Sequence, residues 1–228
     1  AIESQELFVK GQGPPEIPGV EVHKEEGNHA IVTRISIKSK VGAGMMGKSI
    51  GNYTTIEAPG LRQRDMETRD EVTELLAQEL MRYIKDLDTV TPILVIGLGN
   101  WNATPDALGP KVVNQLTVTR HLFQMLPTDV RGKLRPVAAL APGVLGLTGI
   151  ETGEIILGVV QRINPGLVIC IDALASRSSK RLCSTVQISD TGINPGAGVG
   201  NRRLSITPEV LGVPVVSIGV PTVIHATT

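Results

Sequence analysis

Residues 93–110 read ILVIGLGNWNATPDALGP, which joins an apolar run, a glycine-rich loop and a helix start in direct succession. The first four residues do not alternate between polar and apolar, which is typical of a strand buried on both faces. Gly109 and Pro110 favour a helix start, because proline lacks an N–H group that would stay unpaired in the first helical turn. We therefore predict a buried strand that leads through a long loop into a helix.

Strand and helix signals go on alternating along the chain. Capping boxes at residues 68–71 and 148–151 predict helix starts, because a hydroxyl and a carboxylate three residues apart can bond the free N–H groups there. The first of these helices is expected to span about 69–85. Continuous apolar strands separated by helices predict an α/β fold, with a mainly parallel sheet and helices on both of its faces. Further strands are predicted at 137–141, 167–171, 186–189 and 213–218.

The N-terminal part of the chain has a different pattern. Residues 1–20 are rich in glycine and proline, and we expect an extended arm there. Two strands predict a small β-hairpin in a β subdomain at residues 30–58, because the first shows strict alternation of apolar and polar residues. With an α/β core at 68–228, we expect the 228 residues to form a single domain.

The composition limits the classes of function. The chain has 25 glycines and 15 prolines but only two Phe, two Tyr and one Trp, which excludes an aromatic surface that stacks on bases. The 22 basic residues balance the 22 acidic residues, so no global field attracts nucleic acid or a membrane surface. No uninterrupted apolar run reaches the length of a membrane span, about 18 residues. We expect neither nucleic acid nor a membrane as a direct partner.

Cysteine and histidine usage argues against secretion and against metal binding. Cys170 lies inside a predicted apolar strand, and two cysteines make no disulfide framework, which indicates a cytoplasmic compartment. The four histidines lack the spacing of zinc ligands, so no metal site is predicted.

No cofactor is predicted either. The sequence contains no phosphate-binding loop with Gly-Lys-Ser/Thr. Gly97 and Gly99 follow a strand as in dinucleotide-binding proteins, but Asn102 occupies the place of the third glycine.

Asp106 and Asp172 are the leading candidates for catalysis. Ligands of open α/β sheets bind beyond the carboxyl ends of the strands, and Asp172 directly follows the apolar run 167–171. Asp106 precedes the predicted helix, whose dipole favours a negative charge. If the strands are neighbours, the carboxylates converge and one keeps a proton, so the pair offers a base and an acid for attack of water on a peptide bond. The structural alternative is that Asp106 caps a helix and Asp172 lies in a turn.

Asp190 is a third aspartate at the end of a predicted strand. The segment Asp190-Thr191-Gly192 spells the tripeptide of the aspartic proteases, which place it in all-β domains and use it twice or by dimerisation. Here it occurs once, in an α/β pattern, and a turn rich in Asp and Gly explains it as well. Asp190 is therefore the weaker alternative to the pair.

The glycine loop before Asp106 supplies candidates for a supporting role. Backbone N–H groups of residues 97–99, or the side chain of Asn100, are placed to stabilise an oxyanion that forms when water attacks a carbonyl group. Gly99 and Asn100 are therefore predicted as oxyanion or supporting residues. The same loops also fit a different class of protein, a non-catalytic binding module in which an α/β scaffold holds a partner.

Several long motifs resemble the spore germination protease family of endospore-forming bacteria. The resemblance runs along nearly the whole chain, and shorter matches occur at residues 18–20, 51–53 and 219–223. The longer motifs are VIGLGN at 95–100, TPDALGPK at 104–111, TRHLF at 119–123, GIET at 149–152, IDALA at 171–175 and GAGVGN at 196–201.

The resemblance implies an endopeptidase that degrades the small acid-soluble proteins coating spore DNA, so that the enzyme meets DNA only through its substrate. It also implies a zymogen that removes its own N-terminal prosegment, a homotetramer and a location in the spore core. The family fits none of the main protease classes, and its proposed catalytic aspartates match Asp106 and Asp172. Because the family continues beyond Thr228, we expect a further C-terminal portion.

A more distant resemblance points to the hydrogenase maturation endopeptidases, which share the α/β fold. It rests on Gly97-x-Gly-Asn100, on Asp106-x-x-Gly109 and on a second aspartate that ends a later strand. Those enzymes use an acidic pair and a histidine to hold a metal of their substrate. No such histidine is apparent here, and Asn194 stands where a polar ligand is sought. A metal-dependent maturation endopeptidase is therefore the alternative enzyme.

Overall fold

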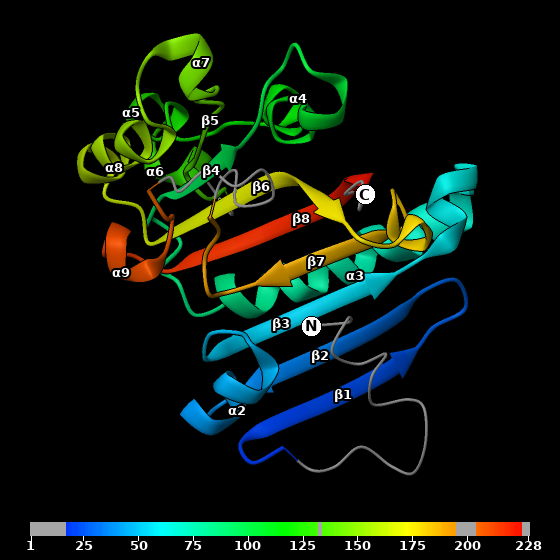
Figure 1. Ribbon diagram of the computed structural model, residues 1–228. Helices are drawn as coiled ribbons and strands as arrows, with labels where there is room; N and C mark the ends of the chain where they lie inside the picture. Colours follow the sequence, from blue (N-terminus) through cyan, green and yellow to red (C-terminus); the bar gives the residue numbers. More distant parts are fainter. Residues whose placement is uncertain (1–16, 132–133, 195–203, 225–228) are drawn as a thin grey trace.

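The computed structural model describes residues 17–131, 134–194 and 204–224, and its named strands form one eight-stranded sheet (Figure 1). The order across the sheet is β1-β2-β3-β7-β8-β6-β4-β5. The strands are β1 (Val20–Glu26), β2 (Ile31–Ile37), β3 (Gly51–Glu57), β4 (Ile93–Gly97), β5 (Val137–Leu140), β6 (Leu167–Ser176), β7 (Thr185–Ser189) and β8 (Val215–Ile224).

The sheet has an antiparallel half and a parallel half. Strands β1, β2, β3 and β7 pair antiparallel in that order, and β7 also pairs antiparallel with β8. Strands β8, β6, β4 and β5 run parallel to one another. The predicted α/β fold is confirmed, but its sheet is mixed. The predicted hairpin is present as β2 and β3, and its pairing with β7 makes it part of the common sheet.

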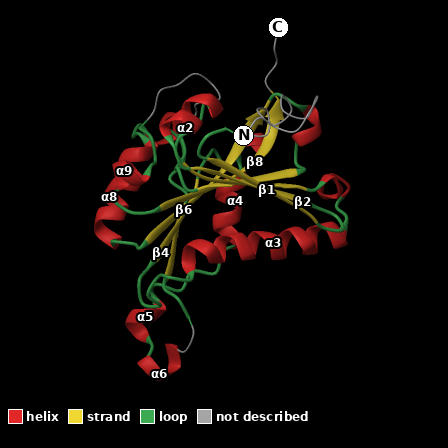
Figure 2. Cartoon of the chain, turned by 90° about the horizontal axis from the view of Figure 1, so that it is seen from below, coloured by secondary structure: helices red, strands yellow, loops and turns green. Residues whose placement is uncertain are grey.

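Helices cover both faces of this sheet (Figure 2). Helices α3 (Met66–Ile84) and α4 (Leu108–Gln115) pack on one face, while α8 (Thr152–Ile163) and α9 (Pro208–Leu211) pack on the other. Short α2 (Lys40–Met46) covers the hairpin on the face opposite α3. The remaining helices are η1 (Pro59–Gln63), η2 (Thr104–Asp106), α5 (Leu122–Met125), α6 (Thr128–Arg131), α7 (Leu145–Thr148) and η3 (Ser179–Arg181).

Strand β4 is buried on both faces, which explains its uninterrupted apolar sequence. Ile93 and Val95 join the core cluster on the α3 face, and Leu94 and Ile96 join the cluster under α8. All four side chains are buried. Burial of a large aliphatic side chain stabilises a fold by about 1.5–3 kcal/mol, so a polar residue anywhere in this strand would weaken one of the two cores.

The two predicted capping boxes were wrong, although both helices exist. Helix α3 begins after Asp65, whose carboxylate accepts a 2.8 Å hydrogen bond from the N–H of Thr68. An aspartate caps a helix as well as a hydroxyl does, so it begins the helix three residues earlier. Helix α8 begins at Thr152, after Glu151, and no side chain caps its start. The hydroxyl of Thr148 donates instead to the carbonyl oxygen of Ile150, at 3.0 Å.

Strand β6 runs past its predicted end. Pairing with β4 ends at Ile171, opposite Gly97, while pairing with β8 continues to Ser176. Asp172 therefore lies within β6 rather than after it, at the point where β4 has ended and its loop begins. Asp172 nevertheless lies level with the carboxyl end of β4, which is the position that the predicted pairing with Asp106 requires.

Some predicted features lie outside the described residues. These are most of the extended arm at 1–20 and the GAGVGN motif at 196–201. In the part of the chain that the structure describes, no helix is both long and apolar enough to cross a membrane.

Candidate active site

The loop after β4 holds Asp106 in a compact, hydrogen-bonded turn. The N–H of Asn100 donates to the carboxylate Oδ2 of Asp106 at 2.9 Å and to its backbone carbonyl at 3.0 Å. The N–H of Ala103 donates to the carbonyl of Asn100, and the N–H of Asp106 donates to the carbonyl of Ala103. The carboxylate is therefore oriented by its own loop.

Two glycines make this turn sterically feasible. Gly99 has a φ of +112°, and a Cβ atom there would lie 2.0 Å from the carbonyl oxygen of Asp106. A Cβ atom on Gly109 would lie 2.4 Å from the carbonyl oxygen of Leu98 and 2.5 Å from that of Ile171. Only glycine avoids both the strained backbone conformation and these clashes, so the loop and α4 can pack directly on the ends of β4 and β6.

Two hydrogen bonds tie the loop to neighbouring strands. The N–H of Leu98 donates to the carbonyl of Ile171 in β6, at 2.8 Å. The hydroxyl of Thr222, in β8, donates to the carbonyl of Pro105, at 2.6 Å. The first bond attaches the start of the loop to β6 at Ile171, the residue before Asp172. The second attaches the loop to β8 at Pro105, the residue before Asp106. Thr222 was not predicted as a site residue, since no local signal in the sequence links it to Pro105.

Asp172 is half-buried, and its carboxylate accepts a 2.9 Å hydrogen bond from the N–H of Ala173. Burial raises the pKa of Asp172 from its ordinary value to about 6. The Ala173 N–H opposes this shift, and the negative charge of Asp106 adds to it. The fold therefore brings the two predicted carboxyl groups within electrostatic reach of each other, as the strand-end argument required.

The neighbouring Cys170 is not a nucleophile. It is completely buried in the strand, and burial raises the pKa of its thiol to about 12, with a smaller contribution from the charge of Asp172. A buried thiol that stays protonated behaves as a small apolar side chain.

Asp190 lies elsewhere and bonds to different groups. Its carboxylate accepts hydrogen bonds from the backbone N–H and the side-chain amide of Asn52, both at 2.7 Å. Its own N–H donates to the carbonyl of Asn52 at 3.3 Å. These contacts fasten the turn after β7 to β3, which is a structural use of the carboxylate.

Gly99 and Asn100 lie beside Asp106. The N–H of Asn100 already bonds Asp106, and its side-chain oxygen accepts a 2.9 Å hydrogen bond from the N–H of Asn102. The contacts of Gly99 and Asn100 thus favour a role in supporting Asp106 over a role in stabilising an oxyanion. Within the described residues, no group of three or more His, Cys, Asp or Glu side chains is arranged to hold a metal ion.

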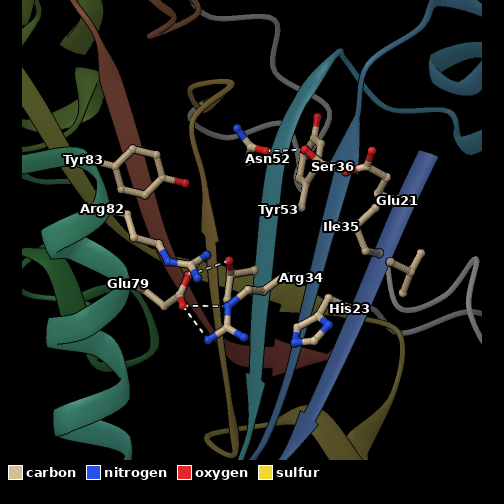
Figure 3. A pocket seen from close by; sticks show the side chains of 12 residues that line it. Glu21, His23, Arg34, Ile35, Ser36, Asn52, Tyr53, Glu79, Arg82 and Tyr83 are labelled. Carbon is tan, nitrogen blue, oxygen red and sulfur yellow. Dashed lines mark hydrogen bonds and ion pairs between the residues drawn. The ribbon is translucent and has the colours of Figure 1, made fainter. Parts of the chain in front are cut away.

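Two surface hollows lie away from the aspartate pair. One of about 390 Å³ has a polar floor on β1 to β3 and a rim on α3 (Figure 3). Beside it, the buried carboxylate of Glu79 bonds Nε and Nη2 of Arg34, both at 2.8 Å, and the hydroxyl of Thr54 at 3.0 Å. The second hollow, of about 520 Å³, is lined partly by Asp190. Neither is lined by Asp106 or Asp172.

Comparison with known proteins identifies the family, because the family model described as germination protease matches residues 1–228. The chain belongs to the germination protease family. A germination protease of Caldanaerobacter subterraneus subsp. tengcongensis is 54% identical, over 100% of this chain and 69% of that protein. The germination protease of Clostridium tetani is 47% identical over 100% of this chain and 70% of its own length. The germination protease of Bacillus pumilus is 48% identical over 100% of this chain and 63% of its own length.

Membership in this family makes the chain a peptidase. The chain spans only part of the length of these germination proteases. Among solved structures, it is similar to the NiFe hydrogenase maturation protease HycI from Thermococcus kodakarensis KOD1, at 20% identity and a TM-score of 0.36. That similarity covers 60% of this chain and 81% of the other.

Proposed function

We propose that this germination protease family member is an endopeptidase that degrades small acid-soluble, DNA-coating spore proteins during germination. Its family supports the peptidase activity, and the motifs noted above suggest the substrate. The observation that carries the mechanism is the half-buried Asp172, whose raised pKa partly reflects the charge of Asp106. A carboxyl group that keeps its proton beside one that is ionised offers an acid and a base at one place.

In the proposed reaction, ionised Asp106 acts as the base and accepts a proton from water. The water oxygen forms a bond to the carbonyl carbon of the peptide, and the C–N bond then breaks. Protonated Asp172 donates its proton to the leaving nitrogen, so that a carboxyl and an amine are released. Solvent exchange returns the proton from Asp106 to Asp172. One water is consumed, and no other reactant is needed.

The contacts of each carboxyl group support this assignment of the two roles. Asp106 accepts the N–H of Asn100, and an N–H donor favours the ionised form of a carboxylate. Asp172 loses hydration by burial, which favours the protonated form. Gly99 and Asn100 support the base by shaping the turn that orients it.

The further properties of the family belong to this proposal too. They are an atypical aspartic-type mechanism, a self-processing zymogen, a homotetramer and a location in the spore core. A single domain over residues 1–228 is supported by the continuous sheet, which joins the hairpin to the α/β half.

The test is incubation of the chain with a purified small acid-soluble spore protein, with and without a chelator. We expect the wild type to cleave, and Asp106→Asn and Asp172→Asn each to lose at least about 100-fold in rate while keeping a native circular dichroism spectrum. Asp190→Asn is the matched control and should still cleave. Cleavage by either variant of the pair at close to the wild-type rate would overturn the mechanism. Inhibition by the chelator would favour the metal-dependent alternative, and binding without cleavage would favour a binding module.

A further inference from the structure

Trp101 is the single tryptophan of the chain, and it lies in the loop that carries Asp106. Its side chain is 51% exposed. Tryptophan usually buries most of its large apolar side chain. This chain has only two Phe, two Tyr and one Trp, so an exposed tryptophan is unusual for it. An exposed indole on a loop at the candidate active site therefore needs an explanation.

The backbone on both sides of Trp101 is fixed. Before it, the N–H of Asn100 bonds Asp106. After it, the N–H of Asn102 donates to the side chain of Asn100 at 2.9 Å, and the N–H of Ala103 donates to the carbonyl of Asn100 at 3.1 Å. The indole is thus presented by an ordered turn, which lowers the entropy lost when a partner covers it.

The same bonds place the backbone of Trp101 close to the carboxylate of Asp106. Its Cα is one peptide unit, about 3.8 Å, from that of Asn100, whose N–H contacts the Asp106 carboxylate. A second exposed apolar side chain, Val223, follows Thr222, which bonds the carbonyl of Pro105. Exposed apolar groups therefore stand in two chain segments that meet at η2.

We propose that Trp101 is a substrate-contacting residue that packs against an apolar side chain of the polypeptide beside the bond to be cleaved. This inference rests on the proposed function, because a peptidase must draw its polypeptide across the Asp106–Asp172 pair. The indole then loses its exposure to water, and the contact sets which residues are accepted near the cleavage point.

The kinetic test uses the purified small acid-soluble spore protein as substrate. Trp101→Ala should raise KM by about 10-fold or more, with a smaller change in kcat, because the lost contact holds the substrate and takes no part in proton transfer. Trp101→Phe should restore much of the affinity, since it keeps an aromatic face. Val90→Ala is the control: Val90 is 61% exposed but precedes β4, at the opposite end of the strand. An unchanged KM in Trp101→Ala would overturn the proposal.

A second measurement is independent of cleavage. Because Trp101 is the only tryptophan, its fluorescence reports on one position. In Asp172→Asn, addition of a substrate free of tryptophan should shift the emission to shorter wavelength as the indole is covered. Binding is followed in parallel by the anisotropy of labelled substrate. Binding without a change in emission contradicts the role of Trp101, whereas cleavage by Asp172→Asn contradicts the proposed mechanism and leaves the KM comparison intact.

Discussion

The hydroxyl of Thr222 donates a 2.6 Å hydrogen bond to the carbonyl of Pro105, which lies 117 residues earlier in the chain. Thr222 belongs to β8, and Pro105 is the residue before Asp106 in η2. Strand β8 also pairs with β6 at Asp172, opposite Gly219. One strand therefore holds the loop of the first aspartate and borders the strand of the second, and we expect Thr222 to act as a positioning residue for the proposed pair.

Thr222→Val should lower kcat about 10-fold with little change in KM, because it removes the hydroxyl but keeps the shape of the side chain. The loss of one hydrogen bond costs only about 1 kcal/mol of stability, so the fold should persist. Thr222→Ser keeps the hydroxyl and should restore kcat, which a purely packing role for the side chain does not explain. Equal kcat in the valine and serine variants would refute the positioning role.

Gly99→Ala should abolish most activity and destabilise the protein by about 2 kcal/mol or more. The alanine must adopt a φ of +112°, and its Cβ would meet the carbonyl of Asp106 at 2.0 Å. Gly158→Ala is the matched control, since Gly158 lies inside α8 and a Cβ there meets nothing within 4 Å. That change should stabilise the protein by about 0.5–1 kcal/mol and leave activity unchanged. Thermal unfolding and cleavage rates check both outcomes.

The part of the fold that sequence could predict is the part with local signals. Strand β4 has an unbroken apolar run, and Gly109 marks the helix that follows. Strand β1 (Val20–Glu26) was missed because its side chains are mostly exposed, so it carries no apolar face and forms through backbone pairing with β2. The antiparallel return of β7 was missed for a related reason, since strand direction depends on partners distant in sequence.

The candidate site, too, has features that the sequence could predict and features that it could not. The placement of Asp106 and Asp172 at one edge of the sheet could be predicted, because carboxyl ends of neighbouring parallel strands meet there and β4 pairs parallel with β6. Thr222 could not be found, since nothing around it in the sequence points to Pro105. The hydrogen bond from the N–H of Asn100 to the carboxylate of Asp106 was also unpredictable, because it depends on the turn that η2 makes back toward β4.

Asp106→Asn should lower the pKa of Asp172, because the charge of Asp106 is one of the causes that raise it. Carboxyl chemical shifts in a carbon-labelled protein check this directly. In the wild type the Asp172 signal should titrate near pH 6. The same titration should appear in the rate: cleavage falls as pH rises through about 6, as the proposed acid loses its proton. An Asp172 titration that is unchanged in Asp106→Asn would show that the carboxyl groups do not interact.

Glu79→Ala should destabilise the protein by roughly 2–4 kcal/mol. Glu79 is only 2% exposed, and its carboxylate holds Arg34 of β2 against α3. Removal of Glu79 leaves Arg34, whose side chain is 17% exposed, with Glu25 as its remaining carboxylate partner. Glu74→Ala, an exposed glutamate on the same helix, should change stability by less than about 0.5 kcal/mol. Similar losses in chemical denaturation of the two variants would contradict this role.

Asp172→Asn should make the fold more stable at alkaline pH while it removes activity. The unfolded state has an ordinary Asp pKa of about 3.9, whereas burial raises that of Asp172 in the fold to about 6. Between these values the native state binds more protons than the unfolded state, so this group's stabilising contribution falls as pH rises through that window.

Asparagine cannot ionise and escapes this cost. The free energy of unfolding of Asp172→Asn should therefore exceed that of the wild type by roughly 1–3 kcal/mol at pH 8, and the two should approach each other near pH 4. Urea denaturation at both pH values measures the difference. Asp86→Asn, at an exposed position after α3, is the control and should show no such divergence. A wild type more stable than Asp172→Asn at pH 8 would mean that the ionised carboxylate is held for structure, which would weaken the case for Asp172 as the acid.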